Sequence, residues 1–381
     1  MIRAWILMCL LTAMCFSPSV QASVLSDVAN AMSVGTWEEI STTDLNFDFF
    51  HYPGEPARLT TAFMGDAMWD PTSQQVLFLG AGHYSSSQMH RYTESSNAWN
   101  KGANPPGAPI GLGHAYYHNS ISVNDRIVLY VRINSRRFRL YEYNIDGNSW
   151  TTRAETANDG DTAHGFVYFP ERRLFYLADG TFGILRVFNR GTNSWSVHAT
   201  NRNCFALGNT TTTGYYHNFA VYNPIRKEIV FGGGNTSNGA NSRAMCTMNE
   251  SGTITEMPLA PTNLGISSDN NGGGLISIDS SSGDLLVLTQ LGQFYAFNFA
   301  SNQWRTINDS ATRPSQFSLT ANNTINDFVV PISTYGVMMY VDEKTKKAFL
   351  YKHAQGGAGP VPPPPPTDSL SPKPVSMLTV R

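Results

Sequence analysis

The sequence has few charged residues, few cysteines and only one long hydrophobic run. Charged side chains make up 14% of the 381 residues, and the formal net charge is -2. This balance gives no global field that attracts nucleic acid, and the basic residues are scattered apart from Arg136-Arg137-Phe138-Arg139. Long amphipathic helical patterns are also missing. We therefore expect no nucleic-acid partner.

The hydrophobic run at the N-terminus is typical of a secretory signal peptide. Arg3 precedes an apolar run from Ala4 to Phe16, and Val20-Gln21-Ala22 follows it. The apolar run is shorter than the roughly 20 residues that a membrane-spanning helix needs. We expect residues 1–22 to be a cleaved signal peptide, no transmembrane segment, and a secreted or periplasmic location.

Cleavage at this position would leave two cysteines, Cys204 and Cys246. An even pair in an oxidising compartment predicts one disulfide bond. The alternative is two buried free thiols, because sequence spacing does not show whether the two Cα atoms lie within roughly 7 Å of each other.

The remaining composition favours short strands joined by many turns. Aromatic residues make up 12% of the chain, with 32 glycines and 17 tyrosines. In the stretch 214–235, a β-rich run at 219–222 is followed by a turn and then by a second run that ends in three glycines. This pattern predicts a hairpin. Antiparallel pairing would bring His217 and the glycine-rich exit to the same end.

The sequence also repeats internally. A tryptophan two residues after an asparagine occurs four times, at steps of about 51, 45 and twice 54 residues. Five units of strand, turn, strand, loop and strand fit this spacing, and a sixth at 328–351 stops one strand short. The segment 35–40 resembles the tryptophan-bearing last strand, so the N-terminus would complete the sixth unit and close a ring without exposed edges. The motif stands at Asn97-Ala98-Trp99, Asn148-Ser149-Trp150, Asn193-Ser194-Trp195 and Asn302-Gln303-Trp304.

A period of about 50 residues, with a glycine run after the second strand and a tryptophan in the last, resembles kelch-type, galactose-oxidase-like β-propellers. The kelch-like glycine runs are Phe78-Leu79-Gly80-Ala81-Gly82 and Phe231-Gly232-Gly233-Gly234. The resemblance implies an all-β, six-bladed β-propeller of four-stranded kelch-like blades, closed by the N-terminal strand, over residues 33–354. Residues 355–381, with five successive prolines, are expected to form a linker or tail.

A propeller gathers the loops that enter each innermost strand and leave each second strand on one face, around the mouth of the central channel. Polar residues recur at both steps of the aligned repeats. The entry step has Asp66, His118, His164, His217, Asn271 and Asp327, and the exit step has His83, Arg132, Asp179, Asn235 and Gln290.

The histidines suggest two kinds of chemistry. His118, His164 and His217 occupy equivalent steps of consecutive units and are candidate ligands of a divalent metal, because three protein ligands and an open position form the usual catalytic zinc site. Alternatively, these histidines act as general bases and acids together with Tyr116 and Tyr215. The copper-radical chemistry of galactose oxidase is not expected, since it would need a cysteine cross-linked to a tyrosine.

Plain binding is the third role, with His83, His114, Arg132 and Asn235 as substrate-binding candidates. We expect a partner that is an extracellular carbohydrate or protein, bound or acted on at the mouth. The alternatives are a polysaccharide lyase that performs β-elimination on a uronate polymer, and a protein-interaction propeller without activity. Strand ends also need hydrogen-bond partners, so a purely structural role for the histidines stays open.

Overall fold

The computed structural model of the chain describes most residues between 24 and 353. The predicted signal peptide and the proline-rich tail lie outside the described residues. Within the described part of the chain, no helix is long and apolar enough to cross a membrane. The described ranges are 24–52, 55–61, 65–80, 88–106, 119–122, 126–133, 137–155, 165–180, 182–200, 202–205, 215–236, 243–265, 274–289, 292–309, 311–314 and 326–353.

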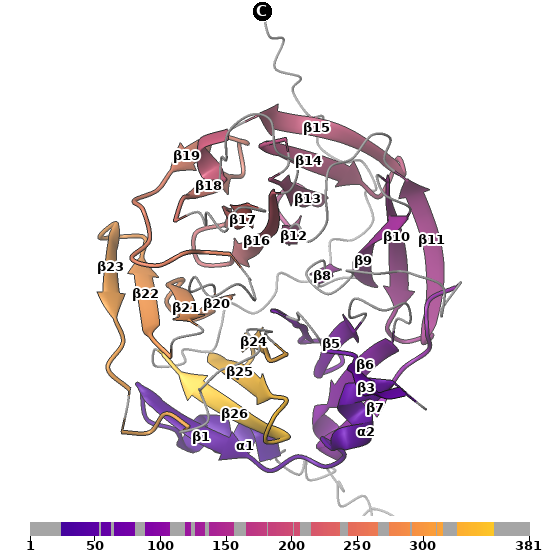
Figure 1. The fold of residues 1–381 in the computed structure, drawn as a ribbon, viewed down its shortest axis with the longest axis vertical. Coiled ribbons are helices and arrows are strands. Elements are labelled where there is room, and N and C mark those ends of the chain that lie inside the picture. Colours follow the sequence, from indigo (N-terminus) through magenta and orange to yellow (C-terminus); the bar gives the residue numbers. More distant parts are fainter. Residues whose placement is uncertain are drawn as a thin grey trace, which may run out of the picture.

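The fold is a β-propeller in which four-stranded antiparallel blades lie in a ring, with their first strands at the centre (Figure 1). Five blades are each formed by four consecutive strands. They comprise β4 (Met68–Asp70), β5 (Gln75–Gly80), β6 (Gln88–Thr93) and β7 (Ala98–Lys101); β8 (Asn119–Ser122), β9 (Arg126–Ile133), β10 (Arg137–Asn144) and β11 (Ser149–Glu155); β12 (Gly165–Phe169), β13 (Leu174–Asp179), β14 (Ile184–Asn189) and β15 (Ser194–Thr200); β16 (Tyr215–Asn223), β17 (Glu228–Thr236), β18 (Met245–Asn249) and β19 (Ile254–Glu256); and β20 (Gly274–Ile278), β21 (Leu285–Thr289), β22 (Phe294–Asn298) and β23 (Gln303–Thr306).

A composite sheet joins strands from both ends of the chain, between the last blade and the first. Its order is β1 (Thr36–Ile40), β26 (Lys347–Lys352), β25 (Val337–Asp342) and β24 (Phe328–Ile332). Trp37 of β1 lies opposite Tyr351 of β26, so the strand at Trp37 pairs with the C-terminal strands as expected. The backbone of Val329 bonds to that of Gly65 and Ala67, which connects this sheet to the first blade.

The predicted fold class needs correction. We expected six repeating kelch-like blades, whereas the ring contains five blades of consecutive strands. We expected the strands at 328–351 and the strand at 35–40 to form the sixth blade. These strands do pair, but their sheet joins the two ends of the chain and is not a further blade of the repeat. The few helices and one small extra sheet were not predicted. These elements are α1 (Val24–Ala31), α2 (Phe47–Phe50), the 3-10 turns η1 (Glu94–Ser96) and η3 (Arg202–Cys204), and β2 (His51–Tyr52) paired with β3 (Glu55–Leu59).

The asparagine of the repeated motif ends the turn before each outer strand. All four of these asparagines have a left-handed backbone, with φ between 44° and 57°. Asparagine tolerates this conformation better than most residues, which explains its position two residues before the tryptophan. In the composite sheet the corresponding residue is Gly35, with φ 81°.

The tryptophans fasten each blade to its neighbour. The indole N–H of Trp150 donates to the carbonyl of Ala103 at 2.7 Å, and that of Trp195 donates to the carbonyl of Ala154 at 3.2 Å. Each acceptor belongs to the preceding blade or the segment that leaves it. Trp37 makes the equivalent bond to the carboxylate of Asp309, which follows the last blade. The motif therefore fixes both the turn and the contact between blades.

The strands next to the centre are buried from both sides. Every residue of β13, β21 and β25 is buried, because each sheet packs face to face against two neighbours. The predicted disulfide is confirmed: Cys204 in η3 is bonded to Cys246 in β18, with the Cα atoms 5.3 Å apart.

Candidate functional site

One face of the ring collects the ends of the inner strands. Within each sheet the first two strands are antiparallel, so the start of the first lies beside the end of the second, as Tyr215 lies beside Thr236. We define the mouth face as the face at which β4, β8, β12, β16, β20 and β24 begin. Functional groups on separate sheets can converge only there or at the opposite end of the channel.

The structure locates four of the nine predicted site residues, and all four lie in strands that reach the mouth face. Tyr215 and His217 are at the start of β16, Arg132 is near the end of β9, and Asn235 is near the end of β17. For three of these only the backbone is described, and His217 is described in full. The residues outside the described part of the chain are His83, His114, Tyr116, His118 and His164.

The backbone of His217 is unusual. Its φ is 66°, and it lies inside β16 between the pairs Tyr216↔Asn235 and Asn218↔Gly233. Among the described residues, the other non-glycine positions with positive φ lie outside the strands. The His217 residue is only 6% exposed. A non-glycine residue in this region is strained, and such strain concentrates at ligand clamps and active sites.

Asn218 fixes the backbone around His217. Its side chain is buried, and its Nδ2 donates to the carbonyl of Gly233 at 2.8 Å. Its Oδ1 accepts from the amide N–H of Gly180, which follows the second strand of the neighbouring blade, at 3.1 Å. A Cβ on Gly180 would lie 2.2 Å from this oxygen, so only glycine fits there without a shift. The bridge holds two blades together beside His217.

Asp179, an exit-step residue, is also buried at this face. Its carboxylate forms an ion pair with Arg186, with 2.9 Å between Oδ2 and Nε. The pair joins β13 to β14 and lies next to Gly180 in the chain. The guanidinium of Arg186 therefore lies close to the hydrogen bonds that the Asn218 side chain makes between the two blades.

The entry residue of the composite sheet can exchange a proton near neutral pH. Burial, together with the nearby carboxylate of Asp342, raises the pKa of Asp327 to about 7. Tyr340 donates its hydroxyl proton to Asp327 Oδ2 at 2.7 Å, and the backbone N–H of Glu343 donates to Oδ1 at 2.9 Å. A carboxyl with this pKa is a suitable general acid or base.

Asp66 occupies the same step of the next innermost strand. It forms an isolated parallel bridge with Val329 of β24, two residues after Asp327. Burial raises the pKa of Asp66 well above its ordinary value, although a backbone hydrogen bond acts in the other direction. Its Oδ1 has no hydrogen-bond partner within the described residues. Two carboxyl groups that hold protons more tightly than usual thus flank the mouth.

The part of the chain that the structure describes contains no cluster of three or more His, Cys, Asp or Glu side chains that would hold a metal ion. The metal site predicted from His118, His164 and His217 requires two residues outside that part and stays a prediction. Copper-radical chemistry of the galactose-oxidase kind does not fit, because Cys204 and Cys246 are bonded to each other. Neither is available for a cross-link to tyrosine.

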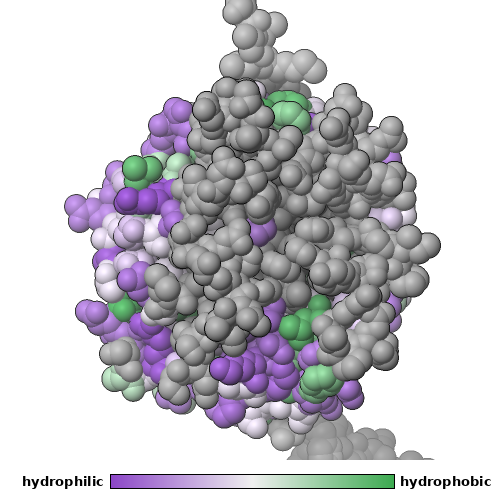
Figure 2. All heavy atoms as spheres, in the orientation of Figure 1, coloured by the Kyte–Doolittle hydropathy of each residue, from purple (hydrophilic) through white to green (hydrophobic). Residues whose placement is uncertain are grey.

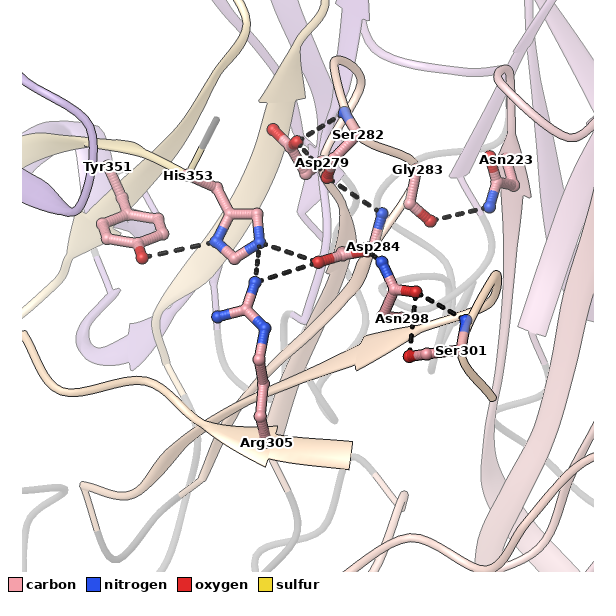
Figure 3. A network of polar contacts seen from close by, with 10 residues as sticks. All are labelled: Asn223, Asp279, Ser282, Gly283, Asp284, Asn298, Ser301, Arg305, Tyr351 and His353. Atoms are coloured by element: carbon pink, nitrogen blue, oxygen red, sulfur yellow. Dashed lines mark hydrogen bonds and ion pairs between the residues drawn. The ribbon is translucent and has the colours of Figure 1, made fainter. Parts of the chain in front are cut away.

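A second polar cluster lies at the opposite end of the strands, between the last blade and the composite sheet (Figure 3). Arg305 Nη2 donates to Asp284 Oδ2 at 3.0 Å and lies 2.8 Å from Nε2 of His353, which is 3.1 Å from the same oxygen. Asn298 donates to Asp284 Oδ1 at 2.8 Å. Because Nε2 either accepts from Arg305 or donates to Asp284, His353 makes one of these two hydrogen bonds, and the cluster links the last blade to the composite sheet.

Sequence reasoning missed both the Tyr340–Asp327 pair and this cluster. Asp327 appeared in the aligned entry step, but nothing in the repeat indicated that Tyr340 reaches it. Asp284 and His353 are 69 positions apart, and they adjoin strands of different sheets, β21 and β26. Their proximity depends on how the ring closes, and no local sequence motif indicates that these two residues lie close together.

The sequence matches no family model and no curated protein. Among solved structures, the chain is similar to an auxiliary nutrient binding protein from Bacteroides ovatus, with 9% identity and a TM-score of 0.50 over 75% of this chain and 68% of that one. It is also similar to SapL1 lectin in complex with alpha methyl fucoside, with 13% identity and a TM-score of 0.48 over 73% and 87% of the two chains. A fungal alcohol oxidase of the AA5 family, in complex with copper, has 7% identity and a TM-score of 0.46 over 76% and 74%. At sequence identities this low, the structural similarity bears only on the fold.

Proposed function

We propose that this chain is an exported, kelch-type β-propeller that binds an extracellular carbohydrate at the mouth face. The observation that carries the proposal is the strained, buried His217 at the start of β16. The surrounding structure holds this residue in a costly conformation, which is expected where a side chain must meet a ligand at a fixed angle.

Further observations support the same face. Asp66 and Asp327 lie just before β4 and β24, the innermost strands of two other sheets, and the backbone positions of Arg132 and Asn235 lie near the ends of β9 and β17. Carboxyl, guanidinium and amide groups are the kinds of acceptor and donor that orient sugar hydroxyls in binding sites. The Cys204–Cys246 disulfide fits an oxidising compartment, which supports export of the chain. The proposal keeps residues 1–22 as the signal peptide, 33–354 as the propeller and 355–381 as a tail.

Binding is tested on the mature chain with a panel that contains alpha methyl fucoside, alginate, pectin, ulvan and glycosaminoglycans. We expect calorimetry to detect at least one ligand, and His217→Ala to weaken its binding while the fold survives by circular dichroism. Ile225→Ala is the matched control, because Ile225 lies in the turn between β16 and β17 at the other end of the same strand. Absence of binding across the panel would refute the proposal.

Lyase activity is a second candidate, and the Asp327–Tyr340 pair favours it. β-Elimination on a uronate polymer needs a base that takes a proton and an acid that protonates the leaving oxygen. With a pKa of about 7, Asp327 is partly ionised at neutral pH and supplies the base, whereas burial raises the pKa of Tyr340, which keeps its proton and supplies the acid. Absorbance at the unsaturated-uronate band, followed with the acidic members of the panel, tests for it. A rise that Asp327→Asn abolishes supports catalysis; binding without any rise leaves a binding protein.

The metal expected from the three histidines is tested separately. Elemental analysis of untagged protein should find near-stoichiometric divalent metal that is lost in His118→Ala, His164→Ala and His217→Ala alike. If the histidines act only through hydrogen bonds or proton transfer, the wild-type protein carries no metal, and the variants lose binding or activity.

A further inference from the structure

Phe182 is an exposed aromatic residue on the mouth face. It lies between the end of β13 and the start of β14 and is 45% exposed. The other large aromatic side chain exposed in the described part of the chain is Phe47 of α2. Among the coloured residues of Figure 2, hydrophobic atoms lie next to hydrophilic ones where α2 lies in Figure 1. A phenyl ring exposed to this extent gains less from burial than a core ring does, so its rigid support points to a role at the surface.

The turn that carries Phe182 is held on both sides. Gly183 has a φ of 63°, and its N–H donates to the carbonyl of Gly180 at 3.3 Å, which closes the turn. Gly180 is itself fixed by Asn218, which contacts the backbone next to His217. Phe182 is therefore presented from a preformed turn that is directly connected to the strained part of the candidate site.

The ring is also supported from one side by a cation. The guanidinium carbon of Arg186 lies 5.8 Å from the centroid of the Phe182 ring, a cation–π arrangement. Arg186 is in turn fixed by the buried carboxylate of Asp179. With one face of the ring against a fixed guanidinium and much of the side chain exposed, the ring provides a flat apolar surface whose orientation is set before binding. Such preorganisation reduces the entropy cost of binding.

We infer that Phe182 is a stacking platform for a pyranose ring of the carbohydrate bound at the mouth face, with Arg186 as the residue that positions it. This inference rests on the proposed function and identifies where a sugar ring packs. The C–H face of a pyranose is the carbohydrate surface that matches a flat, partly exposed phenyl ring. Neutral and acidic sugars share this face, and comparison of pectin with an uncharged galactan separates the two.

The test measures the affinity of Phe182 variants for the panel ligand that the wild-type chain binds. Phe182→Ala should weaken binding about tenfold, in line with the energy of an aromatic stacking contact. Phe182→Leu, which keeps the apolar volume but not the flat face, should be similarly weak, and Phe182→Tyr should bind like wild type. Ile225→Ala, which removes a side chain of the same exposure at the opposite end of the strands, should have no effect.

A spectroscopic variant gives an independent readout. In Phe182→Trp, the new indole should change its emission when the ligand is added, beyond any change in the wild-type protein. If the wild-type chain binds a glycan and Phe182→Ala binds it equally well, the platform is refuted while the proposed function stands. If the wild-type chain binds no glycan of the panel, both are refuted.

Discussion

The indole N–H of Trp37 donates to the carboxylate of Asp309 at 2.5 Å across 272 positions of the chain. The bond joins the first strand of the propeller to the segment that leaves the last blade. Trp37 also packs against Tyr351, with the ring centroids 4.8 Å apart. Trp37 thus adds a buried side-chain contact to the backbone pairing of β1 with β26 that closes the ring, and its removal should affect the whole domain.

We expect Trp37→Phe to lower the free energy of unfolding by about 2 kcal/mol, because a hydrogen bond to a charged group is lost and the carboxylate stays buried. Trp304→Phe is the matched control, since its indole donates to the Pro258 carbonyl at 3.5 Å. Urea unfolding of both variants measures the difference. If both variants lost the same unfolding free energy, the hydrogen bond from Trp37 to Asp309 would contribute no more to stability than the one from Trp304 to Pro258.

His90 should make the protein sensitive to acid. The side chain is fully buried between the rings of Phe78 and Phe49, each with its centroid 4.6 Å from the imidazole. Burial, assisted by the positive charge of Lys101, lowers the pKa of His90 well below its ordinary value of 6.5. Below pH 6.5 the unfolded chain binds a proton that the folded chain does not, so stability falls by up to about 1.4 kcal/mol per pH unit.

In His90→Phe this part of the acid sensitivity should disappear, because an uncharged ring of similar size occupies the same aromatic site. Unfolding free energies at pH 7.0, 6.0 and 5.0 measure the slope in the variant and in the wild type. An unchanged slope between pH 6 and 5 would mean that His90 is not held neutral by the fold.

Asp284 should stabilise the fold at neutral pH and lose this contribution in a lower pH range than His90. Burial raises the pKa of its carboxyl, but the hydrogen bonds from His353 and Arg305 outweigh burial and bring the pKa below its ordinary value of 3.8. A lowered pKa stabilises the fold above pH 3.8, and this contribution is lost as the pH falls through the folded-state value. We expect Asp284→Asn to cost about 2 kcal/mol at pH 7. Melting curves between pH 7 and pH 3 check this, since the difference between the two proteins should narrow as the pH falls below 3.8.

Gly180→Ala tests the contact between the blades at the mouth. The added methyl would lie 2.2 Å from Asn218 Oδ1 and should disrupt both hydrogen bonds of that side chain. We expect a loss of stability of about 1–3 kcal/mol, as for overpacked cores, together with weaker glycan binding. Gly191→Ala, whose Cβ would have its nearest neighbour at 3.3 Å, is the control and should change neither quantity. Weak binding in both variants would argue against a specific role for the bridge.

The sequence predicted the parts of the fold that repeat. The four asparagine–tryptophan steps indicated the outer strands, because a left-handed turn residue and a fastening tryptophan are needed in each blade. The pairing of Cys204 with Cys246 followed from their number. The number of blades was overestimated, because three strands at 328–351 that pair with the strand at 35–40 look like a sixth repeat, although this sheet joins the two ends of the chain.

The site was predictable only as a location. The step occupied by His217 could be aligned, but its φ of 66° depends on the glycines of β17 and on Asn218. The insertion with α2, β2 and β3 lacks a hydrophobic period, so no pattern indicated it. The Phe182–Arg186 contact depends on the shape of a turn between two strands, and the Asp327–Tyr340 pair depends on the register of β24 and β25.

Hydrogen–deuterium exchange with a bound oligosaccharide tests the central claim most directly. At a saturating concentration of the panel ligand, amides at 215–218 and 326–329 on the mouth face should exchange more slowly than in the free protein. Amides in the turns at 223–228 and 279–285, at the opposite end of the strands, should be unchanged. Protection confined to those turns, or no protection by any glycan that binds, would contradict the assignment of carbohydrate binding to the mouth face.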